Sequence, residues 1–278
     1  MFSTLLRLSA AAALVLASTA VHAACTPAIT DDNLIVPGKL QLSINPTNPP
    51  QQFVDKDGQL QGLNVELAKE IAKRICVEPV FLRMDFPPMI PALRSGRFDA
   101  INTGLFWTEE RSKMLYLVPY AQQAISIYTD PSSSLKLEKF EDLAGRVVGV
   151  ESATYTERKA REFSTAMEAK GLKPIELRTF TTVTATSAAL RAGQLEAALN
   201  INETANSLEQ KGIAKIWVRD IAGTDITFAF RDKLLAQAVA DALTAIRADG
   251  TYDRLFDKFG MTKLQATTFA IRGDGPTN

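Results

Sequence analysis

Side chains that commonly carry out catalysis are scarce in this chain of 278 residues. It contains one histidine, His22, and two cysteines, Cys25 and Cys76. Its 31 basic residues are balanced by 31 acidic residues. A chain without a basic excess has no electrostatic means of attracting nucleic acid, so we expect no nucleic-acid partner.

The first 23 residues read as a secretory signal peptide. Arg7 precedes the apolar run 8–17, and Val21-His22-Ala23 supplies small residues for cleavage after Ala23. An uncleaved anchor is the alternative, but the apolar run is short for a membrane span. A lipoprotein signal is disfavoured because His22 stands three residues before Cys25, where an aliphatic residue is required.

Cleavage after Ala23 changes the chemistry available to the mature chain. It removes the only histidine, which excludes Ser/His/Asp and Cys/His catalysis and the commonest metal ligand. It also removes Arg7, leaving one more acidic than basic residue. We therefore expect an exported protein without a metal or other cofactor.

Cys25 and Cys76 most simply form one disulfide in an oxidising compartment. That bond would tie the mature N-terminus to the end of the first predicted helix. Two unrelated thiols are the alternative.

The pattern of apolar residues predicts alternating strands and helices. Residues 38–44 alternate like a strand. The prolines of 45–50 require a loop, Asp55-Lys56-Asp57-Gly58 suggests a hairpin turn, and Asn64 is expected to cap a helix over 65–74. Further strands are predicted at 77–84, 98–103, 120–129, 145–150, 174–180, 195–201, 216–218 and 226–230, and helices at 89–94, 109–114, 137–143, 154–170, 184–191, 202–210, 234–246 and 252–259.

An internal repeat indicates two similar halves. Ala92-Leu93-Arg94-Ser95-Gly96-Arg97-Phe98-Asp99-Ala100 matches Ala189-Leu190-Arg191-Ala192-Gly193-Gln194-Leu195-Glu196-Ala197. Gly38-Lys39 and Gly145-Arg146 open strands at a similar offset. Chance similarity between two helix-glycine-strand units is the alternative.

The repeat favours two α/β lobes joined by a hinge of two crossing strands, with the ligand site in the cleft between them. The expected first lobe is discontinuous, comprising 24–125 and 230–265. The expected second lobe is 126–229, and 266–278 should form a flexible tail.

Five motifs in order resemble periplasmic family 3 solute-binding proteins. They are the proline loop and turn of 45–58, Gly62-Leu63-Asn64-Val65-Glu66-Leu67-Ala68, the segment 90–100, Thr108-x-Glu110-Arg111, and Ala248-Asp249-Gly250-Thr251-Tyr252-Asp253. The resemblance implies a type II periplasmic-binding-protein fold, export to the periplasm, and action as a monomer that delivers a small carboxylate ligand to an ABC permease.

The resemblance also implies a ligand site. Arg111 stands where the family's arginine binds the ligand carboxylate, and guanidinium offers that group a planar pair of donors. An exposed surface arginine is the alternative for Arg111, and core packing is the alternative for the aromatic residues. Further positions matching ligand contacts are Asn48, Phe86, Thr103, Gly104, Phe106 and Thr154, with Ala153 replacing a usual glycine and Phe106 a usual Ser or Thr.

Ile201 stands where the family has an aspartate that pairs with the ligand ammonium. An ammonium buried beside isoleucine would lack its counter-charge. Asn48 and Gln51 also replace usual aromatic residues. We therefore expect a ligand without the standard ammonium contact, such as an organic acid or a modified amino acid, unless Glu151, Glu203 or Asp225 supplies the charge.

Two other functions are compatible with the resemblance. A periplasmic enzyme similar to cyclohexadienyl dehydratase would use Glu151 or Glu203 as a general acid. An accessory protein of a periplasmic dehydrogenase could have lost its ligand contacts, as Ile201 and Asn48 would allow.

The departure at Ile201 yields a first prediction. Ligand-stripped protein titrated calorimetrically with the ordinary amino acids should show no micromolar binding, because the ammonium would be unpaired. Micromolar affinity for several of them would contradict the organic-acid hypothesis.

Overall fold

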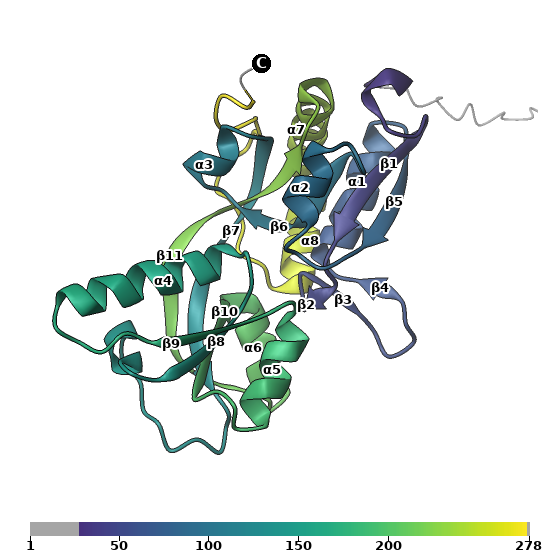
Figure 1. Cartoon of the computed structure of the whole chain (residues 1–278). Coiled ribbons are helices and arrows are strands. Elements are labelled where there is room, and N and C mark those ends of the chain that lie inside the picture. Colours follow the sequence, from purple (N-terminus) through teal and green to yellow (C-terminus); the bar gives the residue numbers. More distant parts are fainter. Residues whose placement is uncertain (1–27, 277–278) are drawn as a thin grey trace, which may run out of the picture.

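Two α/β lobes are joined by two long antiparallel strands, β7 (Tyr116–Thr129) and β11 (Lys215–Phe230) (Figure 1). The structure is a computed structural model that describes residues 28–276. Among these residues, none of the helices has the length and apolar character that a membrane span requires. The predicted signal peptide lies outside the described residues.

One mixed sheet of eight strands runs through both lobes in the order β5-β1-β6-β11-β7-β10-β8-β9. The shared strands β11 and β7 occupy its centre. The remaining strands of the large sheet are β1 (Lys39–Ile44), β5 (Glu78–Arg83) and β6 (Ala100–Phe106) in the first lobe, and β8 (Val147–Glu151), β9 (Glu176–Phe180) and β10 (Ala197–Ile201) in the second. A small antiparallel sheet holds β2 (Thr47–Asn48), β3 (Gln52–Val54) and β4 (Leu60–Gln61), with β3 and β4 forming the predicted hairpin.

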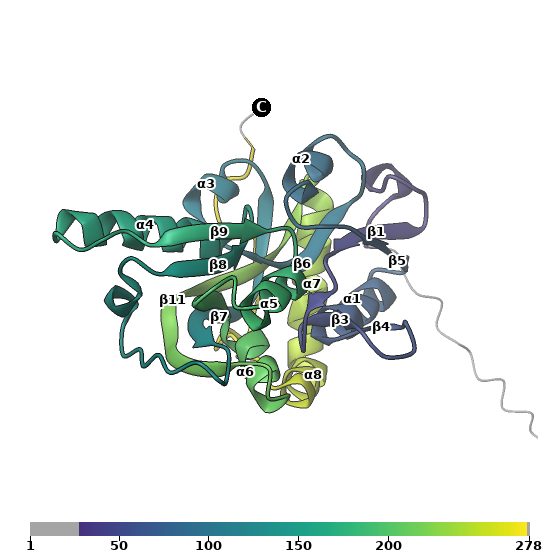
Figure 2. The ribbon, with the colours of Figure 1, turned by 60° about the horizontal axis from the view of Figure 1, so that its bottom comes forward.

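Helices cover the faces of the sheet in each lobe, and α1, α7 and α8 pack together on the first lobe (Figure 2). A strand that is buried on both faces does not need alternating polar and apolar residues. This explains why all five residues of β10, Ala197–Ile201, are buried. The first-lobe helices are α1 (Leu63–Arg74), α2 (Met89–Arg94), α3 (Glu109–Ser112), α7 (Lys233–Ala248) and α8 (Thr251–Phe259); the second-lobe helices are α4 (Tyr155–Ala169), α5 (Val183–Arg191) and α6 (Asn202–Gln210). Short 3₁₀ turns occupy Asp31–Asn33 and Phe140–Leu143.

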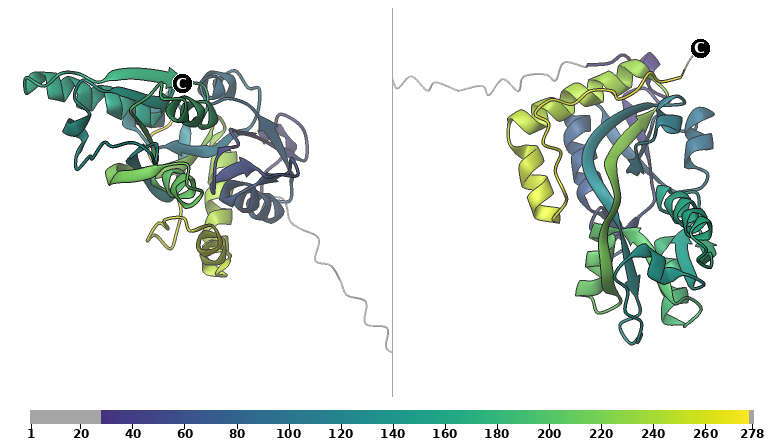
Figure 3. Two further views of the ribbon diagram at one scale, coloured as in Figure 1. Left: turned by 90° about the horizontal axis from the view of Figure 1, so that it is seen from below. Right: turned by 90° about the vertical axis from the view of Figure 1, so that its left-hand side faces the viewer.

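The hinge strand β11 is longer than the sequence predicted. The two separate strands expected at 216–218 and 226–230 form one strand that pairs with β7 throughout (Figure 3). Asp220 and Ala222 interrupt its register, with φ of 62° and 49°. These irregularities broke the alternation that identifies a strand, although pairing with β7 continues across them.

Asn64 is not the helix cap that the sequence predicted. The cap is Gly62, with a φ of 121°, and Asn64 lies inside α1 fully buried. Its side chain donates to Gln52 Oε1 at 2.9 Å and accepts from the Tyr120 hydroxyl at 2.7 Å. Asn64 therefore connects α1 to β3 and to the hinge strand β7.

The internal repeat has a structural role in each half. Asp99 accepts from the backbone N–H of Gln41 in β1 at 2.7 Å. Its counterpart Glu196 accepts from the N–H of Val147 in β8 at 3.0 Å. Each acidic residue thus fixes the turn before its own strand to the start of the neighbouring parallel strand.

Residues 269–275, which were expected to belong to a flexible tail, contact the first lobe. The Phe269 N–H donates to Thr244 Oγ1 at 2.9 Å, and the Arg272 N–H donates to the Leu117 carbonyl at 2.8 Å. The Arg272 guanidinium lies 3.9 Å from the centre of the Trp107 ring and pairs with Asp225. The sequence signal of Gly, Asp and Pro gave no indication of these distant partners.

The predicted disulfide reaches beyond the described residues. No cysteine among residues 28–276 is free. Cys76 lies within that range, but its predicted partner Cys25 lies outside it, so the pairing of the two cysteines stays a prediction.

Replacement of either cysteine in the mature protein tests this bond. A link between Cys25 and Cys76 closes a loop of about 50 residues, worth roughly 4 kcal/mol in the loop-entropy model. Cys76→Ser, Cys25→Ser and the double variant should lower the melting temperature equally, by roughly 10 °C. Two titratable thiols in the unreduced protein would contradict the pairing.

Candidate ligand-binding site

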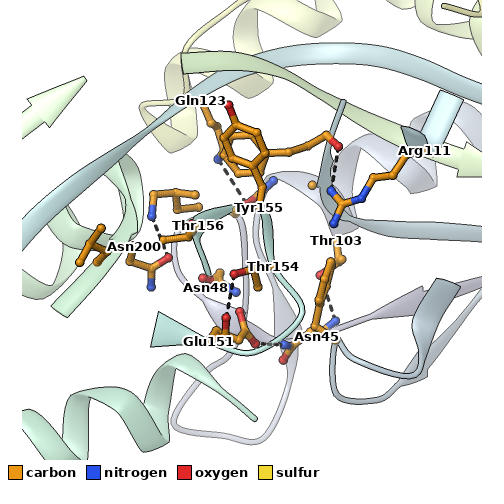
Figure 4. A pocket seen from close by; sticks show the side chains of 16 residues that line it. Asn45, Asn48, Thr103, Arg111, Gln123, Glu151, Thr154, Tyr155, Thr156 and Asn200 are labelled. Atoms are coloured by element: carbon orange, nitrogen blue, oxygen red, sulfur yellow. Dashed lines mark hydrogen bonds between the residues drawn. The ribbon is translucent and has the colours of Figure 1, made fainter. Parts of the chain in front are cut away.

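A cavity lies between the lobes where β6, β8 and β10 end (Figure 4). In α/β sheets, ligands bind at the carboxyl ends of strands. The structure brings together all eight residues predicted from the sequence around this cavity: Asn48, Phe86, Thr103, Gly104, Phe106, Arg111, Thr154 and Ile201. The cavity wall also contains Glu151, which was expected only as an alternative counter-charge, and Gln51, which was expected only as the replacement for an aromatic residue. The sequence did not indicate the other lining residues, which are Asn45, Gln123, Tyr155, Thr156, Leu199 and Asn200.

Arg111 is positioned by the short helix α3. Thr108 caps this helix as predicted, accepting from the Arg111 N–H at 3.1 Å. The partly buried guanidinium donates to the Phe106 carbonyl at 2.9 Å and forms no ion pair within residues 28–276. Burial, aided by Arg158, lowers the pKa of Arg111 to about 10, so an anion bound there would be favoured.

Thr103 presents a hydroxyl proton to the cavity. Its Oγ1 accepts from the Asn45 N–H at 3.2 Å and from Gln52 Nε2 at 3.0 Å. A hydroxyl has two acceptor positions and one proton. With both acceptor positions used, Thr103 can act toward a ligand as a donor.

Gly104 makes room for Gln51. It has a φ of 72°, and a Cβ at this position would lie 2.0 Å from Gln51 Nε2. Gln51 in turn donates to the Tyr120 hydroxyl at 3.2 Å and accepts from Gln123 Nε2 at 3.3 Å. A side chain at position 104 would displace this amide chain from the cavity wall.

Two contacts join the lobes across the cavity. The rings of Phe106 and Tyr155 stack with their centres 4.6 Å apart and an angle of 9° between their planes. Asn45 Nδ2 donates to Glu151 Oε1 at 2.6 Å. The lobes are therefore closed over the site. Phe106, at the position where the family usually has Ser or Thr, contributes a ring that stacks between the lobes.

The loop after β8 is organised by Thr154. Its hydroxyl donates to the Glu151 carbonyl at 2.7 Å and accepts from the Glu157 N–H at 3.1 Å, capping α4. The Thr154 hydroxyl therefore makes hydrogen bonds within the loop, and the residue also lines the cavity. Ala153 has a φ of 61°, a left-handed conformation that costs a non-glycine residue about 1–2 kcal/mol and explains the usual glycine.

The predicted ammonium subsite is apolar. Ile201 ends β10 and is buried in the cavity wall. Of the three acidic residues that could compensate, Asp225 pairs with Arg272 and accepts from Gln122, and Glu203 lines another cavity. Only Glu151 lines the cavity that contains Arg111.

Glu151 is a buried carboxyl group without a cation beside it among the described residues. Burial raises the pKa of Glu151 to about 8; hydrogen bonds from Asn45 and Asn48 oppose the rise and Asp85 adds to it. At neutral pH this conformation therefore favours the protonated carboxyl group.

Two hinged lobes that close over a partly buried arginine define a ligand-capturing binding protein. Residues 40–262 match the family model of bacterial extracellular solute-binding proteins, family 3. The chain belongs to this family, and its relatives include an ABC transporter arginine-binding protein and histidine-binding periplasmic proteins.

Several proteins of known role are similar to the chain. The ABC transporter arginine-binding protein 1 of Escherichia coli K12 is 25% identical over 230 residues, covering 80% of this chain and 90% of that protein. An ancestral arginine-binding protein bound to arginine is 29% identical, with a TM-score of 0.73 over 80% of this chain and 98% of that one. An ancestral amino acid-binding protein, a precursor of cyclohexadienyl dehydratase, is 28% identical with a TM-score of 0.72, over 80% and 95% of the two chains.

Glu203 borders a second cavity behind the hinge, together with Gln123, Asp220 and Thr262. Thr262 Oγ1 donates to its Oε1 at 3.4 Å, and its Oε2 has no hydrogen-bond partner among the described residues. Burial raises the pKa of Glu203 to about 7, with Asp220 adding to the rise.

This burial predicts that Glu203 destabilises the fold as pH rises. The pKa of Glu203 in the folded protein exceeds its pKa in the unfolded chain. The contribution of Glu203 to the free energy of unfolding is therefore most favourable below about pH 4.5 and is lost by about pH 7. Glu203→Gln should raise the free energy of unfolding at pH 8 by up to about 3 kcal/mol, at about 1.4 kcal/mol per pKa unit. It should have little effect near pH 4.

Denaturant titrations at both pH values measure this difference. The exposed Glu168 on α4 offers a control, and Glu168→Gln should change stability little at either pH. Equal effects of Glu203→Gln at pH 4 and pH 8 would contradict the role of ionisation.

Proposed function

We propose that the cavity holds the carboxylate of a small ligand against Arg111 and delivers that ligand to an ABC importer. The observation that carries the proposal is a partly buried guanidinium in the closed cleft that forms no ion pair among residues 28–276, although Glu110 acts on it at longer range. The Thr103 hydroxyl adds a neutral donor. Arginine and hydroxyl donors together match the two oxygens of a carboxylate.

The relatives support a ligand related to amino acids. One of them is named an arginine-binding protein and others histidine-binding periplasmic proteins. Ile201 distinguishes this chain, because a residue without charge replaces the expected partner of the ligand ammonium. The ligand we propose is an amino acid, a modified amino acid or an organic acid that binds without that ammonium contact.

The proposed setting is the periplasm, where the protein acts as a monomer with a membrane-bound permease. Family members named among the relatives are periplasmic, and the predicted signal peptide would be cleaved after Ala23. The proposed lobe boundaries are 24–125 with 230–265, and 126–229. The first boundary falls within β7, and the second falls at the last residue of β11.

Glu151 favours a second candidate function, an enzyme of the cyclohexadienyl dehydratase type. A carboxyl group protonated near neutral pH can donate a proton to a leaving hydroxyl group. A precursor of such an enzyme is among the similar structures. We propose that the chain is a binding protein rather than an enzyme, and an assay for turnover of prephenate and arogenate separates the two. An accessory protein that had lost its ligand contacts is less consistent with the closed cleft around Arg111.

Replacement of Arg111 tests the carboxylate site. The natural ligand is first identified by mass spectrometry after release from freshly purified protein. Arg111→Ala should bind it at least about 30-fold more weakly, because a charge-assisted contact in a desolvated site is worth about 2–5 kcal/mol. Without ligand, the melting temperature of the Arg111→Ala protein should equal that of the wild-type protein.

Arg97→Ala is the matched control, since Arg97 is an exposed arginine just before β6, the strand that leads to α3 and Arg111. It should leave both ligand affinity and stability unchanged. Undiminished stabilisation of the Arg111→Ala protein by the natural ligand would refute the carboxylate site.

A further inference from the structure

We propose that Glu151 sets the ligand specificity by accepting hydrogen bonds from a cationic group at the end of the ligand remote from its carboxylate. The inference rests on the proposed binding of that carboxylate at Arg111. It assigns the ligand to the ω-amino and ω-guanidino carboxylic acids.

The position of Glu151 supports a direct contact with the ligand. It is the last residue of β8, its side chain lines the cavity, and only 9% of its surface is exposed. Figure 4 shows Arg111 at one end of the cavity, with Glu151 and Asn45 at the other. A ligand that spans the cavity would therefore meet a guanidinium at one end and a carboxyl group at the other.

No positively charged group adjoins Glu151 in the part of the chain that the structure describes. Asn45 donates to its Oε1 at 2.6 Å, the amide of Asn48 is a second neutral partner, and Asp85 is a further acidic group. Within residues 28–276, Glu151 forms no ion pair. A buried carboxylate without a counter-charge is costly, and a cationic ligand group would supply that charge.

The same cavity excludes the usual arrangement of an α-amino acid. The position expected to receive the α-ammonium is Ile201, and its neighbour Asn200 uses Oδ1 to accept from the Ile201 N–H at 2.8 Å. The ligand cation is therefore placed at Glu151, separated from the carboxylate by the chain of the ligand.

Glu151 also couples recognition to closure. It comes from the second lobe, and Asn45 follows β1 in the first lobe. A cation bound at Glu151 would hold the carboxylate in place beside Asn45, so the contact that recognises the ligand would stabilise the closed lobes as well.

Calorimetric titration with matched ligands tests the inference. The cationic probes are 4-aminobutyrate, 5-aminovalerate, 6-aminohexanoate and 4-guanidinobutyrate; the probes of similar length without a cation are butyrate, pentanoate and hexanoate. The wild-type protein should bind at least one probe with a cationic group 10-fold or more tightly than its counterpart without that group. Glu151→Gln should abolish this preference for a cationic group.

Comparison of Glu151→Gln with a further variant, Asn45→Ala, separates recognition of the ligand charge from support of the closed lobes. Glu151→Gln retains the oxygen that accepts from Asn45, and Asn45→Ala removes the inter-lobe hydrogen bond while retaining the carboxyl group. Asn45→Ala should weaken binding of all probes by similar factors and preserve the preference for a cation. Loss of preference in Asn45→Ala but not in Glu151→Gln would overturn the inference.

The Arg111→Ala protein tests the carboxylate site independently. Loss of all binding in that variant, with an unchanged preference in Glu151→Gln, would refute the role of Glu151 while sustaining the proposed function. Failure of every cationic probe to bind the wild-type protein more tightly than its counterpart would also refute it.

Discussion

A guanidinium removed from water needs acceptors or an anion to replace its hydration. Arg111 has one backbone acceptor, Phe106, and no carboxylate partner among residues 28–276. The cap at Thr108 fixes the start of its helix, and β6 ends at the residue whose carbonyl it contacts. The first lobe thus presents an unpaired positive charge, and closure of the second lobe surrounds it with a wall that is mostly neutral.

The second lobe repeats the scaffold of the first without repeating its charge. Asp99 and Glu196 fix equivalent turns to β1 and β8, so the strand ends face one cleft from both sides. At those ends, the first lobe provides Arg111 through α3, whereas the second provides Ile201 and a buried carboxyl group at Glu151. A common framework therefore supports two chemically different walls.

Much of the site could be predicted because strand ends and helix caps are local features. Thr108 follows from its helix-cap pattern, and the assignments of Arg111 and Ile201 follow from the resemblance to the family. Phe106 was assigned to the cavity, but its stacking on Tyr155 depends on lobe closure, which no local pattern encodes. The burial of Asn64 and the anchoring of Arg272 likewise depend on partners that lie far apart in sequence.

The C-terminal segment makes the end of the chain a poor place for a fused reporter or an immobilisation tag. Gly275 N–H donates to the carbonyl of Ser112, the last residue of α3, at 2.9 Å, and a Cβ on Gly273 would lie 2.5 Å from the Ser112 side chain. Arg272 meanwhile contacts the hinge through Asp225. Force or bulk applied at this terminus would reach both the helix that holds Arg111 and the strand about which the lobes move.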